Sequence, residues 1–437
     1  MTQDDALNIL KMGHNVFLTG SPGSGKTFLL NEYIEYLRKH NKAVAITAST
    51  GIAATHMNGI TIHSWSGLGI KEHISPTEIK ALLKKKYLIK KIKTAKVLVI
   101  DEVSMLKASQ FDAVSEICRY FKKSFLPFGG MQVVLSGDFF QLPPIERDGR
   151  EPQFIVESAA WKMLDIKVCY LESQHRHKDQ HLSSLLDNMR ENNVEKAQEI
   201  LAHHQQMQRQ FLEGAIETKL YTHNVDVDQI NDRELGKIDA AEFVYDMTTL
   251  GHSDIIASLK RSCLSPERLV LKEGAQVMFI KNNFEVGYVN GTQGRVIGFD
   301  AMGMPIIKTV TGKIISAQKA GWSVDDEQGS VIAEIRQIPL RLAWAITVHK
   351  SQGMNLDSAE IDLSKCFVKG MGYVALSRLK SFAGLRVIGI NDLAFQVNEK
   401  AVEMDKEFKA MSARVEAQLN KIPAVQIEKQ QAKFIAA

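Results

Sequence analysis

A glycine-rich octapeptide near the N-terminus has the residue types needed to hold phosphate groups. Residues 20–27 read GSPGSGKT and satisfy the pattern G-x(4)-G-K-[ST]. They lie between a predicted buried strand, residues 15–19, and a predicted amphipathic helix, residues 27–38, which is the context that this pattern requires. Glycines allow backbone N–H groups to surround phosphate oxygens, and the start of the helix adds its positive dipole. We therefore expect Lys26 to reach the β- and γ-phosphates of a nucleoside triphosphate and Thr27 to offer its hydroxyl to Mg²⁺.

Two adjacent carboxylates follow another apolar run. Residues 97–102 read VLVIDE, so Asp101 and Glu102 stand at the carboxyl end of a predicted buried strand, the edge at which α/β proteins bind ligands. We expect Asp101 to hold the metal, directly or through water, and Glu102 to orient and deprotonate the attacking water. A solvated acidic turn would explain this dipeptide alone, but the phosphate loop favours the hydrolytic interpretation.

A glutamine follows a further predicted strand, residues 131–136, and the dipeptide Gly137-Asp138. Gln141 in this place is suited to contact the γ-phosphate and to respond to its hydrolysis, as positioned glutamines do in other nucleotide hydrolases. Taken alone, it would more often be a plain loop residue.

The elements that position these residues alternate between strands and helices. Apolar, β-branched runs at residues 43–48, 96–101 and 131–136 are typical of parallel strands buried on both faces, and the helical stretches between them predict right-handed βαβ units. After about residue 270, short β-type runs separated by turns predict a small antiparallel barrel or sandwich. The α/β pattern then resumes, so we expect a β module inserted into a second α/β domain, followed by a helical tail from about residue 396.

Composition sets broader limits. The chain has 437 residues, 45% of them hydrophobic and 24% charged, which excludes disorder as its main state and suggests two to four domains. The four cysteines lie far apart without a CxxC pair, which argues against a disulfide framework or a zinc site. Neither a signal peptide nor an apolar run of ~20 residues is apparent. We expect a soluble protein of the cytoplasm.

One segment concentrates the positive charge. The chain has 54 basic and 50 acidic side chains, but Lys80 to Lys96 contains eight lysines and no acid, which leaves 46 basic against 50 acidic elsewhere. An amphipathic helix with Leu82, Leu83, Leu88, Ile89 and Ile92 inward would leave these lysines in solvent. The same helix would also allow them to contact the phosphates of a nucleic acid, and we favour that contact if the protein has a partner whose phosphates it tracks.

Seven segments of the chain form a recognisable set. They are GSPGSGKT (20–27), TASTGIAA (47–54), TIHSWSGLG (61–69), VLVIDEVSML (97–106), PFGGMQVVLSGDFFQLPPI (127–145), ITVHKSQGMNLD (346–357) and GYVALSR (372–378). Together these segments resemble superfamily 1 helicases, and within them the petite-integration-frequency (PIF) family, close to the RecD and Dda-type 5′→3′ enzymes. The resemblance runs from Gln3 to about residue 390.

The resemblance implies two RecA-like domains with ATP and Mg²⁺ between them. The first would span residues 1–160, with a wedge insertion at about 66–93. The second would span 161–250 and 336–395, interrupted by an SH3-like β-barrel at 251–335, and a helical tail would occupy 396–437.

The resemblance also implies site residues. Arg378 matches an arginine of the family's last motif and Arg176 the arginine of the motif that opens the second domain, although His175 and His177 replace the neighbours usual there. Gln3 is similar to the glutamine that reads adenine. The residues expected to bind the nucleotide are Gln3, Gly20, Ser21, Pro22, Gly23, Ser24, Gly25, Lys26, Thr27, Phe28 and Gly353.

By the same resemblance, two sets of residues would grip single-stranded DNA. Thr47, His63 and Ser64 would do so on the first domain, and Thr347, His349 and Lys350 on the second. Phe139, Phe140 and Trp65 would either stack on bases or pack in the core, and Phe139 is our choice for a DNA contact.

The implied activity is ATP-dependent 5′→3′ translocation and unwinding of duplexes, forks and G-quadruplex or RNA–DNA hybrid structures in genome maintenance. We expect a monomer that acts at single-strand/double-strand junctions of the bacterial nucleoid, and a minimal bacterial member of the family. A DNA-stimulated ATPase that displaces bound proteins without processive unwinding is one alternative. A small-molecule kinase is another, which the second-domain arginines and HKSQG disfavour.

Overall fold

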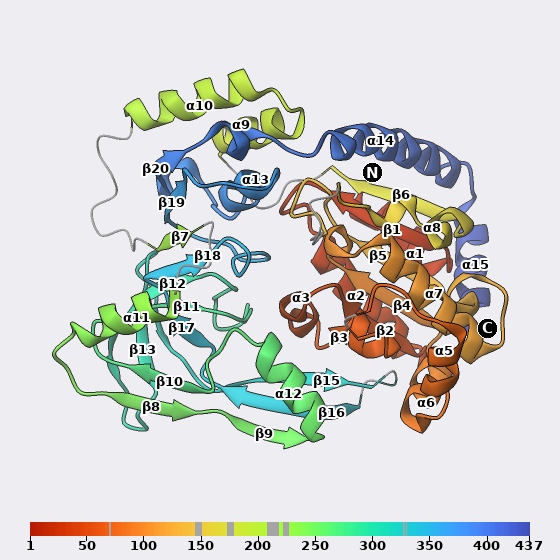
Figure 1. Ribbon diagram of the computed structural model, residues 1–437, viewed down its shortest axis with the longest axis horizontal. Coiled ribbons are helices and arrows are strands. Elements are labelled where there is room, and N and C mark those ends of the chain that lie inside the picture. The colour runs from red at the N-terminus through yellow and green to blue at the C-terminus, as the bar shows by residue number, and fades with distance from the viewer. Residues whose placement is uncertain are drawn as a thin grey trace.

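The computed structural model describes residues 1–69, 71–144, 151–172, 179–207, 218–221, 227–326, 328 and 330–437. Two parallel sheets lie side by side, with an antiparallel β region beneath the second and two C-terminal helices beside the first (Figure 1). Arg176 lies outside the described residues.

The first sheet has six parallel strands in the order β3-β2-β4-β5-β1-β6. Its central strands are buried on both faces because helices cover each side. In β4, Leu98 and Ile100 join the cluster that contains α7, whereas Val97 and Val99 join the cluster that contains α1 and α2. The strands are β1 Asn15–Gly20, β2 Val44–Ala48, β3 Ile60–Thr61, β4 Val97–Asp101, β5 Gln132–Ser136 and β6 Ile166–Leu171. The helices are α1 Gln3–Lys11, α2 Lys26–Lys39, α3 Gly51–His56, α4 Ile62–Ser66, α5 Pro76–Leu82, α6 Lys86–Thr94, α7 Ala108–Lys122 and α8 Ala159–Met163.

The predicted end of the first domain, at residue 160, is wrong. Strand β6 pairs along its whole length with β1, so the chain stays in the first sheet as far as Leu171. An apolar strand does not reveal from its own sequence which of two sheets it will join.

The second sheet is also parallel, in the order β18-β7-β19-β20. Its strands come from two stretches of chain on either side of the β region, as the insertion hypothesis predicted. They are β7 Lys219–Tyr221, β18 Ala345–Thr347, β19 Ala359–Leu363 and β20 Leu385–Ile390, with helices α9 Gln180–Arg190, α10 Val194–Met207, α11 Val227–Gly236 and α13 Met371–Leu376.

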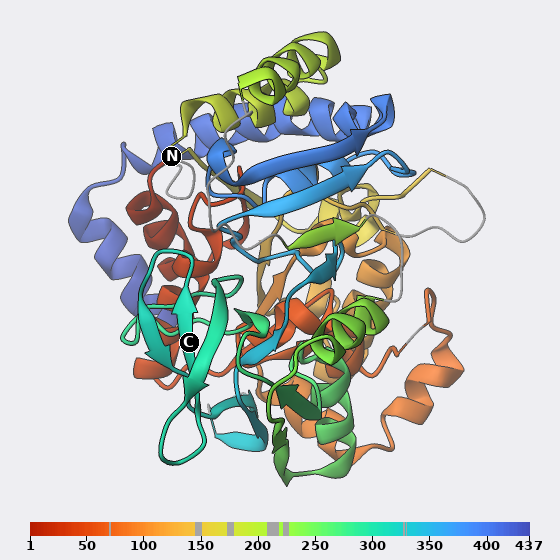
Figure 2. The ribbon, with the colours of Figure 1, turned by 90° about the vertical axis from the view of Figure 1, so that its left-hand side faces the viewer.

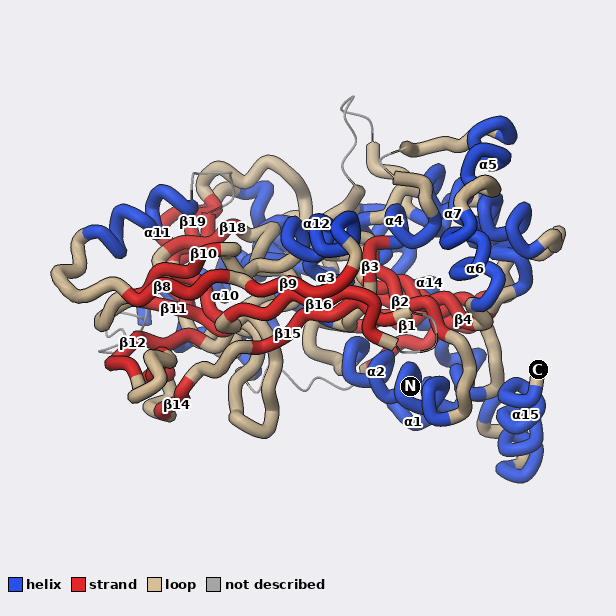
Figure 3. The backbone as a smooth tube through the Cα atoms, turned by 90° about the horizontal axis from the view of Figure 1, so that it is seen from below, coloured by secondary structure: helices blue, strands red, loops and turns tan. Residues whose placement is uncertain are grey.

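The β region contains antiparallel sheets of two, five and three strands, below the second sheet in Figure 2. It is wider than the predicted 251–335, because β8 precedes these limits, β9 begins before them, β16 ends after them and β17 follows them. Strands β15, β16 and β9 extend toward α3 and β3 of the first half (Figure 3), and Asp325 at the end of β15 pairs with Arg38 of α2 at 2.8 Å. The elements are β8 Phe243–Asp246, β9 Thr248–Gly251, α12 Ser253–Ser262, β10 Arg268–Leu271, β11 Gln276–Phe279, β12 Gln293–Phe299, β13 Pro305–Thr309, β14 Ile314–Ser316, β15 Ala320–Asp325, β16 Val331–Gln337 and β17 Leu340–Leu342.

The tail is helical, as predicted, and it returns to the first sheet (Figure 1). Helix α14, Glu399–Leu419, packs along β6, and the Phe408 ring lies 5.1 Å from that of Phe17. Helix α15, Ala424–Ala436, contacts α1. Short 3₁₀ helices occupy Val103–Met105, Pro127–Gly130, Ile155–Glu157, Phe382–Gly384 and Asp392–Phe395. Within the described residues, none of the helices combines the length and apolarity needed to cross a bilayer.

Candidate nucleotide site and nucleic-acid face

The phosphate loop joins β1 to α2 through glycines that a larger residue would not replace. Gly23 and Gly25 have φ of 85° and 88°, and a Cβ on Gly20 would lie 2.5 Å from the carbonyl oxygen of Leu171. Helix α2 begins directly after Gly25 without a side-chain cap, so its first N–H groups face the loop. This geometry provides the N–H cradle and the dipole that the motif predicts.

Two side chains lie against this loop. The Lys26 ammonium donates to the carbonyl oxygens of Gly20 at 2.8 Å and Ser21 at 3.1 Å. The Gln3 amide, at the first position of α1, donates to the carbonyl oxygen of Ser24 at 3.2 Å. Thr2 caps α1 by accepting from the Asp5 amide, so Gln3 is held at the loop rather than in a frayed terminus.

The carboxylates at the end of β4 have perturbed proton affinities. Burial raises the pKa of Asp101, while the nearby Lys26 charge opposes the shift. Burial, followed by the negative charge of Asp101, raises the pKa of Glu102 to about 7, against the opposing charges of Lys26 and Arg378. A carboxyl that exchanges its proton near neutral pH is suited to general base catalysis.

Arg378 brings a cation to this site from the half of the protein that contains the second sheet. It follows α13 and is only 2% exposed, with Nε donating to the Val374 carbonyl oxygen at 3.0 Å and Nη2 to the Ser377 hydroxyl at 2.8 Å. Burial lowers its pKa, and the charge of Glu102 acts in the opposite direction. The acidic and the basic group of the site therefore come from different halves of the protein and lie close enough to influence each other's charge.

Gln141 lies where two halves of the protein meet: the first half is built around the first sheet, and the second half around the second sheet and the β region. It is buried, and its Nε2 donates to Asp138 Oδ2 at 3.4 Å, whereas its Oε1 lacks a hydrogen-bond donor among the described residues. A Cβ on Gly370, the residue before α13, would lie 3.1 Å from the Gln141 carbonyl oxygen. A small movement of α13 would therefore change the position of the Gln141 backbone.

A cavity of about 440 Å³ lies between the halves. Thr27, Asp101 and Glu102 line it from the first sheet, and Lys350 and Gly353 line it from the loop after β18. The ring of Phe28, 65% exposed, also lines it. The structure thus brings together residues from both ends of the sequence that were singled out separately.

Three side chains that we expected to contact DNA are buried instead, so the structure contradicts the expected contact for these side chains. Thr47 is fully buried, and its hydroxyl donates to the Val99 carbonyl oxygen at 2.6 Å. Thr347 is 5% exposed and its hydroxyl accepts the Lys350 amide. Phe139 packs among Phe17 at 5.5 Å and other core rings instead of facing solvent.

The other aromatic candidates, Phe140 and Trp65, are also buried, so the core alternative is confirmed for both. The position of these residues in their motifs did not show whether each side chain points into the core or toward solvent.

The remaining expected contacts lie at the surface. Ser64 is exposed, while His63, His349 and Lys350 are half-buried. Burial lowers the pKa of both histidines, which therefore favour the neutral form at neutral pH. Neutral imidazoles offer hydrogen bonds rather than charge to a nucleic acid.

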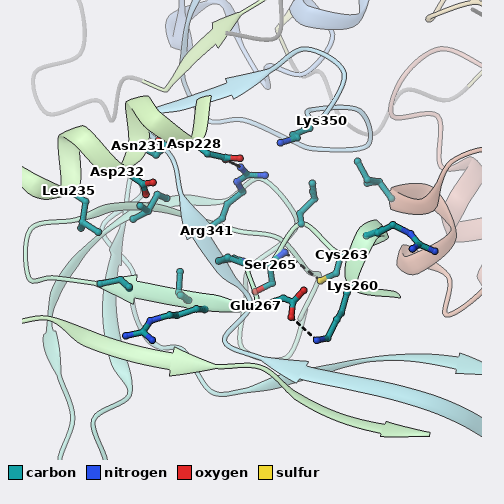
Figure 4. Close-up of a pocket in the computed structure, with 18 residues that line it drawn as sticks. Asp228, Asn231, Asp232, Leu235, Lys260, Cys263, Ser265, Glu267, Arg341 and Lys350 are labelled. Atoms are coloured by element: carbon teal, nitrogen blue, oxygen red, sulfur yellow. Dashed lines mark hydrogen bonds and ion pairs between the residues drawn. The ribbon is translucent and has the colours of Figure 1, made fainter. Parts of the chain in front are cut away.

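Lys350 also borders a second cavity, of about 500 Å³, between α11, α12 and the strands of the β region (Figure 4). Arg341 on β17 is 7% exposed there, its Nε lacks an acceptor among the described residues, and its Nη2 is 3.6 Å from Asp228. The sequence interpretation missed Arg341, because a single arginine in an apolar strand gives no signal of its surroundings. Its incompletely paired guanidinium is suited to a phosphate. The other basic residues that line the cavity are Lys260, Arg261 and Arg268.

The lysine-rich segment forms two helices, α5 and α6, rather than one. Leu82, Leu88 and Ile92 are buried against the first domain. Lys84 and Lys85, between the two helices, and Lys86, the first residue of α6, are exposed. The amphipathic arrangement is confirmed, and contact with DNA stays a prediction.

Comparison with known proteins identifies the family. The model of the PIF1-like helicase family matches residues 4–207, and that of the 2B domain of the DNA helicase Pif1 matches residues 254–299. The ATP-dependent DNA helicase Pif1 of a Psychrobacter species is 41% identical over the whole chain, which covers 75% of that protein.

Two solved structures of Pif1 from Bacteroides have a similar fold. Each match covers 93% of this chain and 96% of the Bacteroides chain, at 28% sequence identity. The TM-score is 0.79 for the complex with ADP-AlF4 and 0.62 for the complex with single-stranded DNA. On these grounds, and with a phosphate loop, paired carboxylates and an arginine from the second sheet in one site, the chain belongs to the Pif1 family of ATP-dependent DNA helicases.

Proposed function

We propose that this enzyme hydrolyses ATP between its two parallel sheets and uses the cycle to move 5′→3′ along single-stranded DNA, unwinding duplexes and forks. The observation that carries the proposal is the charge interaction between Arg378, which follows α13 in the half built on the second sheet, and Glu102, which follows β4 of the first. A site completed by two bodies changes when they move, which couples hydrolysis to motion. G-quadruplex and RNA–DNA hybrid structures are further proposed substrates.

In the proposed site, Lys26 contacts the β- and γ-phosphates, Glu102 activates water, and Gln141 senses the γ-phosphate. Thr27 and Asp101 supply the hydroxyl and carboxylate oxygens that suit Mg²⁺, a hard cation. When bound, the metal neutralises phosphate charge. Arg378 stabilises the charge that develops on the transferring phosphoryl group, a role worth ~10³–10⁵ in rate for such arginines. Arg176, outside the described residues, is proposed as a second cation.

In the proposed cycle, two surfaces grip the DNA strand in turn. His63 and Ser64 belong to the first half, and His349 and Lys350 to the second. Because the loop that carries Lys350 also lines the cavity beside Thr27 and Glu102, closure around ATP would shift one surface relative to the other. The Bacteroides complex with single-stranded DNA supports this choice of ligand.

The test is unwinding of duplexes with a 5′ or a 3′ single-stranded tail, with ATP and Mg²⁺, by the wild type, Lys26→Ala and Lys39→Ala. Lys39 lies at the far end of the same helix and pairs with Glu35 in solvent, so it is a matched control. We expect unwinding of the 5′-tailed duplex by the wild type and Lys39→Ala. Lys26→Ala should lose DNA-stimulated hydrolysis, because the ammonium that it lacks contacts phosphates of the nucleotide in the proposed site. Its Kd for single-stranded DNA should stay within about threefold of the wild-type value, because Lys26 is not among the proposed DNA contacts.

Robust turnover by Lys26→Ala would contradict the site assignment, and preference for the 3′ tail would contradict the polarity. DNA-stimulated hydrolysis without strand separation on either tail would instead identify an ATPase that displaces bound proteins.

A further inference from the structure

Arg190, the last residue of α9, lies at the centre of a buried hydrogen-bond network. The residue is 6% exposed. Its Nη1 donates to the Tyr373 hydroxyl at 2.8 Å and to Asp138 Oδ1 at 3.3 Å. Its Nη2 donates to the Tyr170 hydroxyl at 2.9 Å and to Asp405 Oδ1 at 2.9 Å. The planar guanidinium therefore holds two phenols and two carboxylates in fixed directions, which an ammonium cannot do.

These partners come from three separate parts of the fold. Asp138 and Tyr170 belong to the first sheet, at the turn after β5 and on β6. Tyr373 lies on α13 of the second half, and Asp405 on α14. Burial alone would lower the pKa of Arg190, but the surrounding phenols and carboxylates raise it. The guanidinium is thus a permanent charge that links both halves and the C-terminal helix.

One half of the network leads directly to the nucleotide site. Asp138 also accepts from the Gln141 amide side chain at 3.4 Å and from the Phe140 backbone amide at 3.2 Å, so it shapes the turn that carries Gln141. The Phe140 ring lies 4.0 Å from the Arg190 guanidinium carbon. On the other side, Tyr373 precedes Arg378 by five residues and donates to Asp138 Oδ2 at 3.3 Å.

We propose that Arg190 is a positioning residue that fixes the Gln141 turn and helix α13, which Arg378 follows, relative to one another for hydrolysis. It does so through Asp138 and Tyr373 and does not itself touch the phosphates. The inference rests on the proposed role of Arg378 in the transition state.

The other half of the network offers an internal control. Tyr170 accepts from Arg190 and donates to Asp405 at 3.0 Å, just as Tyr373 accepts from Arg190 and donates to Asp138. Tyr170 joins β6 to α14 and leads to neither Gln141 nor Arg378. Replacing either tyrosine by phenylalanine removes one hydroxyl and leaves the same kind of buried gap.

The experiment compares Tyr373→Phe with Tyr170→Phe in the full chain, measuring kcat and KM for ATP at saturating single-stranded DNA, together with Tm. We expect Tyr373→Phe to lower kcat and kcat/KM by about tenfold with KM within about twofold, the pattern for an interaction made only in the transition state. Tyr170→Phe should lower Tm by a similar amount and leave kcat within about twofold. Arg190→Lys, which keeps the charge but loses the planar fork, should reproduce the kcat loss of Tyr373→Phe.

Equal kcat for the two tyrosine variants would overturn the inference and leave Arg190 a structural residue. If Tyr373→Phe does not fold, Arg190→Lys decides, and wild-type kcat for that variant overturns the proposal. Arg378→Lys is measured in parallel: normal turnover by that variant refutes the proposed role of Arg378 itself. A loss in Arg378→Lys with normal turnover in Tyr373→Phe refutes only the positioning role of Arg190.

Discussion

Replacing Glu102 by glutamine should separate catalysis from stability. Glu102 is half-buried beside Asp101, and its pKa is raised to about 7 from an ordinary value of 4.5. In the unfolded chain the carboxyl ionises near 4.5, whereas in the folded protein it stays protonated until about pH 7. Ionisation between these values therefore favours the unfolded chain, so the contribution of Glu102 to the free energy of unfolding is highest below pH 4.5 and falls as pH rises to about 7.

The size of the effect follows from that difference. At ~1.4 kcal/mol per pH unit, a rise from 4.5 to about 7 corresponds to a ceiling of about 3 kcal/mol at pH 8. Glutamine carries no such penalty, so Glu102→Gln should be more stable than wild type at pH 8 and equally stable at pH 4.5. In Tm the gain is expected to be several degrees, since 1 kcal/mol shifts a domain of 150–250 residues by about 2–4 °C.

The assay is thermal unfolding of wild type and Glu102→Gln from pH 4.5 to 8, with ATP turnover measured on the same samples. Turnover should fall by at least about a hundredfold, because glutamine cannot accept the proton of the attacking water. The control is Glu32→Gln on the exposed side of α2, which should change neither property. A stability difference that does not grow with pH would refute the desolvation argument, and retained turnover would refute the role of Glu102 as base.

Two further predictions concern the DNA-binding surface. Replacing Lys84, Lys85 and Lys86 by glutamine should weaken binding of single-stranded DNA and lower the slope of log Kd against log salt by ~0.7 for each phosphate that these lysines neutralise in the wild type. The same charge change at the exposed Lys421, Lys429 and Lys433 is the control, and equal effects of the two triple variants would assign the effect to net charge alone. Phe139→Leu should lower the free energy of unfolding by roughly 1–3 kcal/mol, because its ring packs in the core, and leave Kd for DNA within about twofold. Weaker DNA binding at unchanged stability would restore the stacking role of Phe139.

Local patterns were sufficient for much of the nucleotide site. The phosphate loop, the VLVIDE strand and the alternation of strands and helices each depend on a few adjacent residues, and the structure contains all three elements. The interrupted second domain was also predicted, because the change from α/β to turn-rich β texture extends over many residues. Such features are encoded by short-range periodicity and backbone preference.

The surroundings of individual side chains were harder to predict from the sequence. Thr47 and Phe139 stand in motifs that suggest contact with DNA, yet both side chains point into the interior. Strand β6 was assigned to the wrong sheet, because its partner β1 lies about 150 residues earlier in the chain. Arg190 carried no signal in its own segment.

Site residues could therefore be predicted from the sequence where a single segment of backbone carries them, as at Lys26 and at Asp101. The charge interaction of Arg378 with Glu102, and the hydrogen bonds of Arg190 to residues of β6, α13 and α14, join segments that are far apart in the chain. Those contacts arise only when the sheets pack and water leaves the interface, and the same burial raises the pKa of Glu102 to about 7.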